Sequence, residues 1–150
     1  MLRALSDDAL QKLLQEDAPY GDLTTMGLGM GEMTGSVVMA ARQPMTVCGV
    51  EEAVRLFELC GASATVIARS GQHVLGGAEL ITAKGRASTL LLAWKVAQTL
   101  MECASGIASE VARMVTELRA AGHAQPVACT RKTFPGTRAL SVKAVLSGGG

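Results

Sequence analysis

The spacing of hydrophobic and polar residues predicts a mixture of helices and strands along the first hundred residues. Ser6 precedes two acidic residues and a stripe of leucines, which predicts a capped helix that ends before Pro19. The following segment around Asp22 predicts a turn that the Asp22 side chain closes or caps. Short apolar runs separated by glycine-rich turns predict four strands and one further helix: strands at 35–41, 45–48, 64–68 and 79–83, and a helix at 51–59. This mixture indicates an α+β amino-terminal domain, with a mixed sheet and helices.

The pattern changes after residue 86, where apolar residues recur at three- and four-residue steps over 87–121. Gly106 interrupts this run, and a glycine inside a helix costs about 1 kcal/mol, so we expect two helices that meet near Ser105–Gly106. A short apolar run at 126–129 predicts a buried strand, and residues 139–146 predict another helix.

The segment between this strand and this helix carries the clearest candidate chemistry. Arg131 and Lys132 follow directly on the expected strand, and Pro135 with Gly136 turns the chain sharply. Ligands in α/β folds lie outside the carboxyl ends of strands. An arginine fork and a lysine ammonium suit a carboxylate or a phosphate. The pattern therefore favours an anion site, and a solvated basic turn remains the alternative.

Composition narrows the possible partners. The net charge is +1 and aromatic residues make up 3% of the chain, so neither a nucleic acid nor an anionic membrane surface is an expected partner. Lys95 interrupts the longest apolar run, which argues against a membrane span, and early acidic residues argue against a signal peptide. The four cysteines are widely spaced and only two histidines accompany them. This favours buried, reduced thiols in a cytoplasmic protein over a zinc site.

Several motifs, taken in order, resemble the quinolinate phosphoribosyltransferase family, also called nicotinate-nucleotide pyrophosphorylase, and most closely its ModD branch. The motifs are Glu16–Asp17, Gly21–Thr25, Ser105–Ala108, Thr130–Thr133, Pro135–Gly136, Arg138, Lys143–Val145 and Gly148–Gly150. The resemblance implies transfer of ribosyl phosphate from phosphoribosyl pyrophosphate to the ring nitrogen of quinolinate or a related aromatic acid. Pyrophosphate leaves, and with quinolinate a decarboxylation gives nicotinate mononucleotide. The resemblance also implies Mg²⁺ with the donor and a homodimer or higher oligomer with shared active sites.

The same resemblance suggests roles for four residues as substrate-binding groups, while the catalytic residues stay unassigned. It places Arg131 and Lys132 at the acid and the phosphoribosyl donor, with Thr130 adding a hydroxyl or backbone contact. Lys95 occupies the position of a family arginine that reaches the neighbouring subunit's active site. Without the resemblance, the commoner reading of Lys95 is a surface lysine whose stem covers apolar residues. Trp94 and Thr99 replace a glutamate and an asparagine of the pattern, which sets this chain apart from quinolinate enzymes.

The resemblance also divides the chain. Residues 1–100 correspond to the amino-terminal α/β sandwich domain, including the first part of the linking helix, and residues 101–150 to the first one or two units of a truncated α/β barrel. A complete barrel takes about 250 residues, so we expect the 150-residue chain alone to lack transferase activity. The alternatives are an inactive fragment that acts only as an anion-binding or oligomerisation module, and an unrelated regulatory α+β domain, which the ordered motifs disfavour.

Overall fold

The computed structural model describes residues 2–150, which form five helices and five strands. Along the chain these elements are α1 (Asp7–Asp17), α2 (Leu23–Gly27), β1 (Thr34–Ala40), β2 (Met45–Thr46), α3 (Val50–Leu59), β3 (Ser63–Val66), β4 (His73–Val74), β5 (Glu79–Arg86), α4 (Ala87–Ala120) and α5 (Arg138–Ser147).

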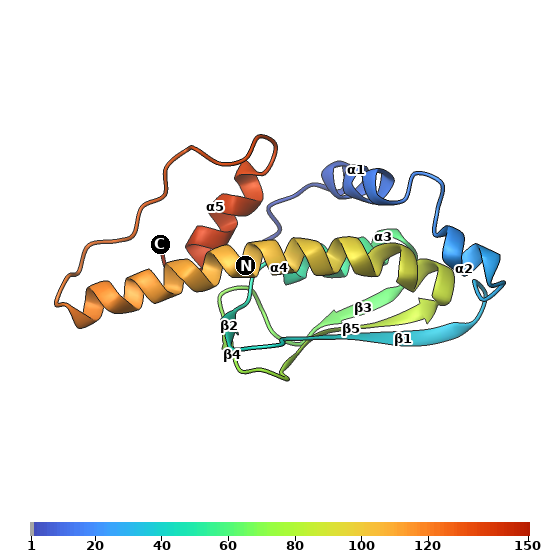
Figure 1. Cartoon of the computed structure of the whole chain (residues 1–150), viewed down its shortest axis with the longest axis horizontal. Helices are drawn as coiled ribbons and strands as arrows, with labels where there is room; N and C mark the ends of the chain where they lie inside the picture. The colour runs from blue at the N-terminus through green and yellow to red at the C-terminus, as the bar shows by residue number, and fades with distance from the viewer. Residues whose placement is uncertain (1) are drawn as a thin grey trace.

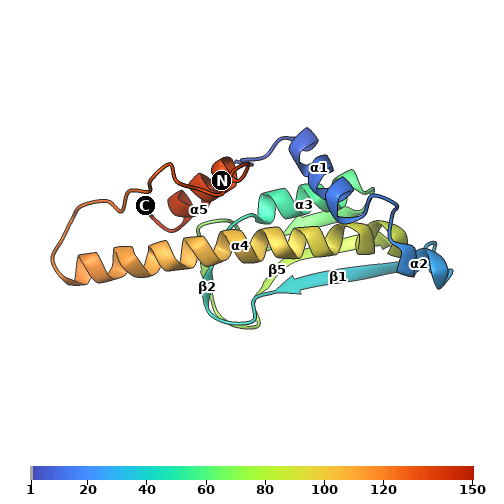
Figure 2. The ribbon, with the colours of Figure 1, turned by 45° about the horizontal axis from the view of Figure 1, so that its top comes forward.

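The strands form a three-stranded antiparallel sheet in the order β1-β5-β3 and a small antiparallel pair of β2 and β4. Helices α3 and α4 cover one face of the larger sheet, and α1 packs on the far side of these helices (Figure 1). Helix α4 runs the length of the molecule, and its carboxyl-terminal half projects beyond the sheet, where α5 packs against it (Figures 1 and 2). The α+β amino-terminal domain predicted from the sequence is therefore present.

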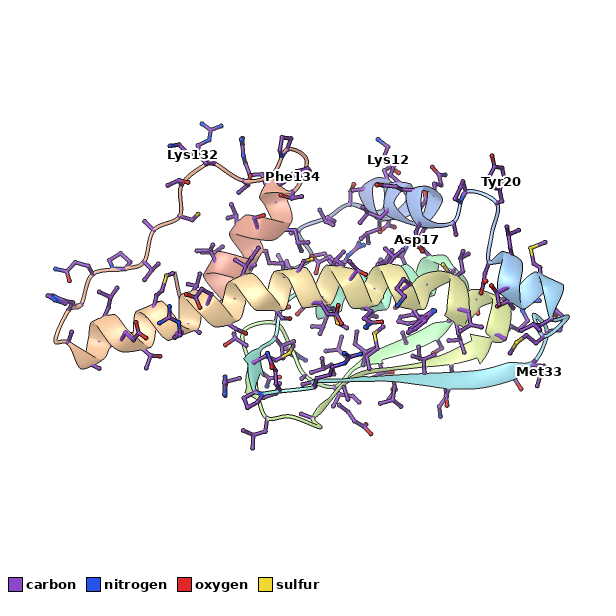
Figure 3. The ribbon with its side chains drawn as sticks, viewed as in Figure 1. Lys12, Asp17, Tyr20, Met33, Lys132 and Phe134 are labelled. Carbon is purple, nitrogen blue, oxygen red and sulfur yellow. The ribbon has the colours of Figure 1, made fainter. Side chains whose placement is uncertain are left out.

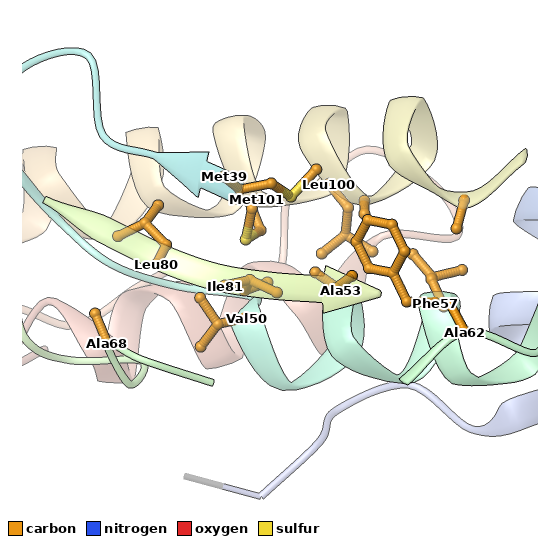
Figure 4. Close-up of a cluster of buried hydrophobic side chains, with 14 of the residues drawn as sticks. Met39, Val50, Ala53, Phe57, Ala62, Ala68, Leu80, Ile81, Leu100 and Met101 are labelled. Atoms are coloured by element: carbon orange, nitrogen blue, oxygen red, sulfur yellow. The ribbon is translucent and has the colours of Figure 1, made fainter. Parts of the chain in front are cut away.

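The main core lies between the sheet and the two helices that cover it (Figure 4). Phe57 of α3 and Ile81 of β5 are completely buried, as the alternation in β5 and the apolar stripe of α3 require. Burying a side chain of this size stabilises the fold by about 1.5–3 kcal/mol. The other residues drawn in this cluster include Met39, Val50, Ala53, Ala62, Ala68, Leu80, Leu100 and Met101.

The predicted helix cap at Ser6 and the predicted capping role of Asp22 are confirmed in detail. The Ser6 hydroxyl accepts a hydrogen bond from the Ala9 backbone at 3.2 Å and begins α1. Asp22 begins a short helix, α2, by accepting backbone hydrogen bonds from Thr24 and Thr25. The helix that follows Asp22 was not predicted, because the glycine- and methionine-rich sequence after it carries no helical periodicity.

The predicted break at Ser105–Gly106 is wrong, because α4 is one continuous helix of 34 residues. Gly106 is exposed and its position is open, while Ser105 is buried and packs against the amino-terminal domain. The Ser105 hydroxyl accepts from the Cys48 backbone N–H at 2.9 Å and donates to its carbonyl at 3.1 Å. Tertiary contacts on both sides of Gly106 therefore outweigh its low helix propensity. None of the helices in residues 2–150 has the length and apolar character needed to cross a bilayer.

Two further expectations are wrong. Residues 126–129 form no strand and are mostly exposed. Within residues 2–150 no strand lies beside them to supply hydrogen bonds, and a parallel strand is stable only when it is paired and covered. The four cysteines are free, but only Cys48 is buried, whereas Cys103 and Cys129 are exposed.

Two glycine substitutions should change stability in opposite directions. Gly49 precedes α3 with a φ of 86°, and a Cβ there would lie 2.8 Å from Leu100 Cδ2. Gly49→Ala should therefore cost at least about 1–2 kcal/mol, the cost of a left-handed backbone for an L-residue. Gly106→Ala adds a methyl group that meets nothing within 4 Å, and it should stabilise α4 by up to about 1 kcal/mol. Urea unfolding of both variants measures the difference, and equal effects would contradict this description of the two sites.

Candidate anion-binding site

The predicted basic segment lies in the long loop that joins α4 to α5. The Lys132 backbone N–H donates to the Thr130 hydroxyl at 3.3 Å, and Thr137 donates to the Phe134 carbonyl from both its N–H and its hydroxyl. Gly136 has a φ of 85°, so the sharp turn expected after Pro135 is present. Figure 3 shows Lys132 and Phe134 on the part of this loop that lies farthest from α4 in that view.

The loop and the two helices that flank it enclose a hollow of about 370 Å³. Thr130 and Lys132 line it from the loop, Ser141 and Val145 line it from α5, and Ile107 lines it from α4. Arg131 is exposed, is not part of this lining, and forms no hydrogen bond or ion pair within residues 2–150. The structure thus brings Thr130 and Lys132 together, with Arg131 between them in sequence and open to solvent.

Lys95 lies elsewhere in the chain. It is exposed on α4, and its Nζ lies 4.4 Å from the centre of the Trp94 ring. Twelve residues of helix separate Lys95 from Ile107, a distance of about 18 Å along the axis. One chain therefore does not bring Lys95 to the hollow that Thr130 and Lys132 line.

A larger hollow of about 790 Å³ lies between β1 and α4, away from the basic loop. Its walls mix apolar and polar groups, and of its two cations Arg113 already pairs with Glu110 and Glu117, while Arg42 is exposed. The smaller hollow is lined by four hydroxyl-bearing residues, Thr130, Thr133, Thr137 and Ser141, and by Lys132, which forms no ion pair within residues 2–150. The smaller hollow is therefore the candidate anion site, because it combines these hydroxyl groups with this lysine of the predicted basic segment.

The structure also contains a buried group of charges that sequence reasoning missed. Lys143 of α5 donates to Glu52 at 2.6 Å and to Glu51 at 2.9 Å, and both carboxylates come from the first turn of α3. Lys143 is 4% exposed and Glu52 is completely buried. Two signals were present in the sequence: a single lysine within the apolar run of α5, and two adjacent acids at the start of an apolar helix. Nothing in the sequence pairs residues that lie ninety positions apart.

The pKa values of Lys143 and Glu51 are both shifted by this arrangement. Burial opposes the charge on Lys143, but its hydrogen bonds to Glu52 and Glu51 outweigh burial and raise the Lys143 pKa above its usual 10.5. Burial likewise opposes the charge on Glu51, but hydrogen bonds from Ser70 and Lys143 outweigh it and lower the Glu51 pKa below its usual 4.5. Glu51 and Lys143 are therefore held in their charged forms at neutral pH.

The lowered pKa of Glu51 predicts how stability changes with pH. A group whose pKa is lower in the folded state stabilises the fold above its unfolded pKa, and this contribution is lost as pH falls through the folded pKa. Glu51→Gln should therefore destabilise the chain at neutral pH, and the difference from the parent should shrink as pH falls below about 4.5. Urea unfolding of both proteins across this range measures it. A difference that is independent of pH would contradict the assigned shift.

Comparison with known proteins gives the context of this site. Residues 22–105 match the model of the quinolinate phosphoribosyl transferase N-terminal domain, and residues 107–150 match that of its C-terminal domain. The ModD pyrophosphorylase of Rhodobacter capsulatus is 50% identical over 145 residues, which cover 97% of this chain and 56% of that protein. The nicotinate-nucleotide pyrophosphorylase of Methanocaldococcus jannaschii is 31% identical over 150 residues, covering 52% of its length. The chain spans about half the length of the curated relatives it matches.

Solved structures of NadC and of a nicotinate-nucleotide pyrophosphorylase have a similar fold over nearly the whole length of this chain. The crystal structure of NadC from Streptococcus pyogenes aligns with a TM-score of 0.88 and 28% identity, over 96% of this chain and 51% of that one. The nicotinate-nucleotide pyrophosphorylase of Ehrlichia chaffeensis aligns with a TM-score of 0.85 and 25% identity. NadC continues into an α/β barrel, which confirms the predicted fold class of an α+β domain followed by the start of a barrel. From the two domain matches and the shared fold, the chain belongs to the quinolinate phosphoribosyltransferase family.

Proposed function

We propose that this chain supplies part of the active site of a phosphoribosyltransferase of the ModD type. The enzyme transfers ribosyl phosphate from phosphoribosyl pyrophosphate to the ring nitrogen of quinolinate or a related aromatic acid. The observation that carries the proposal is the pair Arg131 and Lys132, exposed beside a hollow in the segment that matches the carboxyl-terminal domain of the family. In this role Lys132 and Thr130 bind the donor's phosphate groups, and Arg131 binds the acid's carboxylate.

The charges present suit this chemistry. Both substrates are anionic, and pyrophosphate gains charge as its bond to the sugar carbon breaks and the bond from that carbon to the ring nitrogen forms. Fixed cations stabilise such charge best where little water is present. No group of three His, Cys, Asp or Glu residues within residues 2–150 could hold a metal ion. In this proposal Mg²⁺ enters with the pyrophosphate of the donor, as part of the substrate.

Lys95 fits this proposal only through a second subunit. Its distance of about 18 Å along α4 from Ile107 excludes a shared contact within one chain. In a homodimer or higher oligomer with shared active sites, Lys95 of one subunit would face the acid bound by the other. An ammonium there is a point charge, whereas an arginine grips a carboxylate through two parallel bonds. Among these acids the exchange favours one other than quinolinate as the natural acceptor, because the two adjacent carboxylates of quinolinate favour arginine.

A turnover assay tests the proposal. These 150 residues would replace the matched residues of the Rhodobacter capsulatus relative, which is 50% identical to them. With phosphoribosyl pyrophosphate, Mg²⁺ and a panel of aromatic acids, the chimera should release pyrophosphate only when an acceptor is present. Binding of the donor without turnover on any acid would favour the anion-binding module instead. Neither binding nor turnover would reject both assignments.

Lys95→Arg should raise the turnover of quinolinate. The gain of one good charged bond corresponds to about tenfold, since 1.4 kcal/mol is a factor of ten. The ratio of kcat/KM for quinolinate between the two chimeras measures it. Lys12→Arg, at an exposed lysine on α1, is the matched control and should change nothing.

Mixed dimers show whether Lys95 acts across subunits. Chimeras carrying Lys95→Ala or Arg131→Ala should be inactive alone, and mixing them should restore one intact site per dimer. No recovery in confirmed mixed dimers would make Lys95 a surface lysine whose stem covers apolar residues, the alternative that the sequence leaves open.

A further inference from the structure

The group formed by Glu51, Glu52 and Lys143 joins the two parts of the structure that carry the proposed site. The two carboxylates belong to the amino-terminal domain, and Lys143 belongs to the helix that follows the basic loop. Lys143 lies only five residues after Arg138, where α5 begins and the loop ends. The position of Lys143 therefore determines where the downstream end of the loop enters α5.

Glu51 and Glu52 also accept hydrogen bonds from other residues of the amino-terminal domain. Glu52 also accepts from the Ala4 backbone N–H at 2.5 Å. Glu51 accepts from the Ser70 hydroxyl at 2.5 Å and from its backbone N–H at 3.3 Å. The first turn of a helix favours carboxylates, because its backbone N–H groups are unpaired there. These contacts hold the two carboxylates in place independently of Lys143.

The other end of α5 is held just as closely. The Ser147 hydroxyl lies 2.8 Å from the Lys143 carbonyl and 3.4 Å from the Cys48 sulfur. A Cβ at Gly148 would lie 2.5 Å from the carbonyl oxygen of Ala108, so the end of α5 touches the backbone of α4. Ala144 is completely buried between these contacts. Helix α5 therefore has one position relative to α3 and α4.

The loop itself is held by little else. The hydrogen bonds within 130–137 join Thr130 to Lys132 and Phe134 to Thr137, and the bonds that reach a helix join Thr137 to Ser141 of α5. A loop with so few contacts takes its position from the elements at its two ends, here α4 and α5. The ion-pair group therefore acts on Thr130 and Lys132 through α5, without touching the hollow that they line.

We infer that Glu51, Glu52 and Lys143 are positioning residues, which hold α5 and through it the Thr130–Lys132 segment in the geometry that binds the donor's phosphate groups. The part of this inference that concerns binding rests on the proposed function. The part that concerns geometry does not. A stabilising role alone would lower the resistance to unfolding and leave both the loop position and the affinity of the folded protein unchanged.

Spin labels can report the loop position in the 150-residue chain. One label goes on the exposed native Cys129 and the other on a cysteine introduced at Val38, a half-exposed position on β1, with Cys60 and Cys103 changed to serine. The parent should give one narrow distance distribution. Lys143→Met should broaden or shift it, and so should the milder Glu51→Gln if Lys143→Met fails to fold. Arg55→Met, which removes a pair between α3 and α1, is the control and should leave it narrow.

A titration of the same unlabelled variants with phosphoribosyl pyrophosphate and Mg²⁺ completes the test. Lys143→Met or Glu51→Gln should weaken binding at least about tenfold, because small displacements of binding groups have effects of this size or larger. A narrow, unshifted distribution in the folded variants would overturn the inference. A parent that shows the narrow distribution but no affinity for the donor would reject the proposed function, and the distance measurements would still decide the positioning role.

Discussion

Replacement of Lys143 by methionine should lower the free energy of unfolding by about 3–5 kcal/mol, the usual cost of removing one partner from a buried ion pair. Lys143 is 4% exposed, and without it Glu51 and Glu52 would face each other with their cation removed. Methionine fills a similar volume, so lost charge rather than a cavity accounts for the effect. The penalty should shrink as pH falls below about 4.5, because the stabilisation from the charged Glu51 is lost as pH falls through its lowered pKa. Urea unfolding at neutral and acid pH measures both expectations.

Lys12→Met is the matched control, since Lys12 is an exposed lysine on α1 (Figure 3). Surface substitutions of this kind usually change stability by no more than about 0.5 kcal/mol. If Lys143→Met and Lys12→Met have similar effects, the ion-pair group contributes little. An effect of Lys143→Met that is the same at acid and neutral pH would show that packing, not charge, is responsible.

Replacement of Arg131 by alanine should weaken binding of the acid substrate by about 1.5–3 kcal/mol, the range for a hydrogen bond to a charged group. This corresponds to roughly 10- to 150-fold in affinity. The fold should survive, because Arg131 is exposed and has no hydrogen bond or ion pair within residues 2–150. Calorimetric titration of the chimera with the acid that it turns over measures the affinity, and thermal unfolding checks the fold.

Arg119→Ala serves as the control, because Arg119 is an exposed arginine in the last turn of α4 and does not line the hollow. It removes the same charge from the end of the helix that precedes the loop. Equal losses for the two variants would mean that only the general charge of this region matters. Unchanged affinity in Arg131→Ala would show that Arg131 does not bind the acid substrate.

Local signals in the sequence predicted the amino-terminal domain well. Alternation places Ile81 inside β5, and the stripe of α3 buries Phe57, because both patterns depend on burial of one face. The same reasoning failed where contacts between residues distant in sequence determine the local structure. Ser105 binds the Cys48 backbone across 57 positions and keeps α4 continuous past Gly106. Residues 126–129 have the composition of a strand but no strand beside them in residues 2–150.

The candidate site was predictable only in part for the same reason. Thr130 and Lys132 line one hollow, as adjacent positions of one motif should. The sequence separates Lys95 from them by 35 positions and does not say whether one chain or two brings them together. Lys143 was visible as part of a motif, but its partners Glu51 and Glu52 could be identified only from the structure. Buried pairs between distant elements leave no periodic signal.

The most direct test of the assigned site is a map of the backbone amide resonances of the isotope-labelled chain during titration with phosphoribosyl pyrophosphate and Mg²⁺. Residues that contact the donor, or that move when it binds, change their resonance positions. If the loop is the donor site, the changes should centre on Thr130–Lys132 and the first turn of α5, around the smaller hollow. Changes centred instead on β1 and Trp94, around the larger hollow, would contradict this assignment.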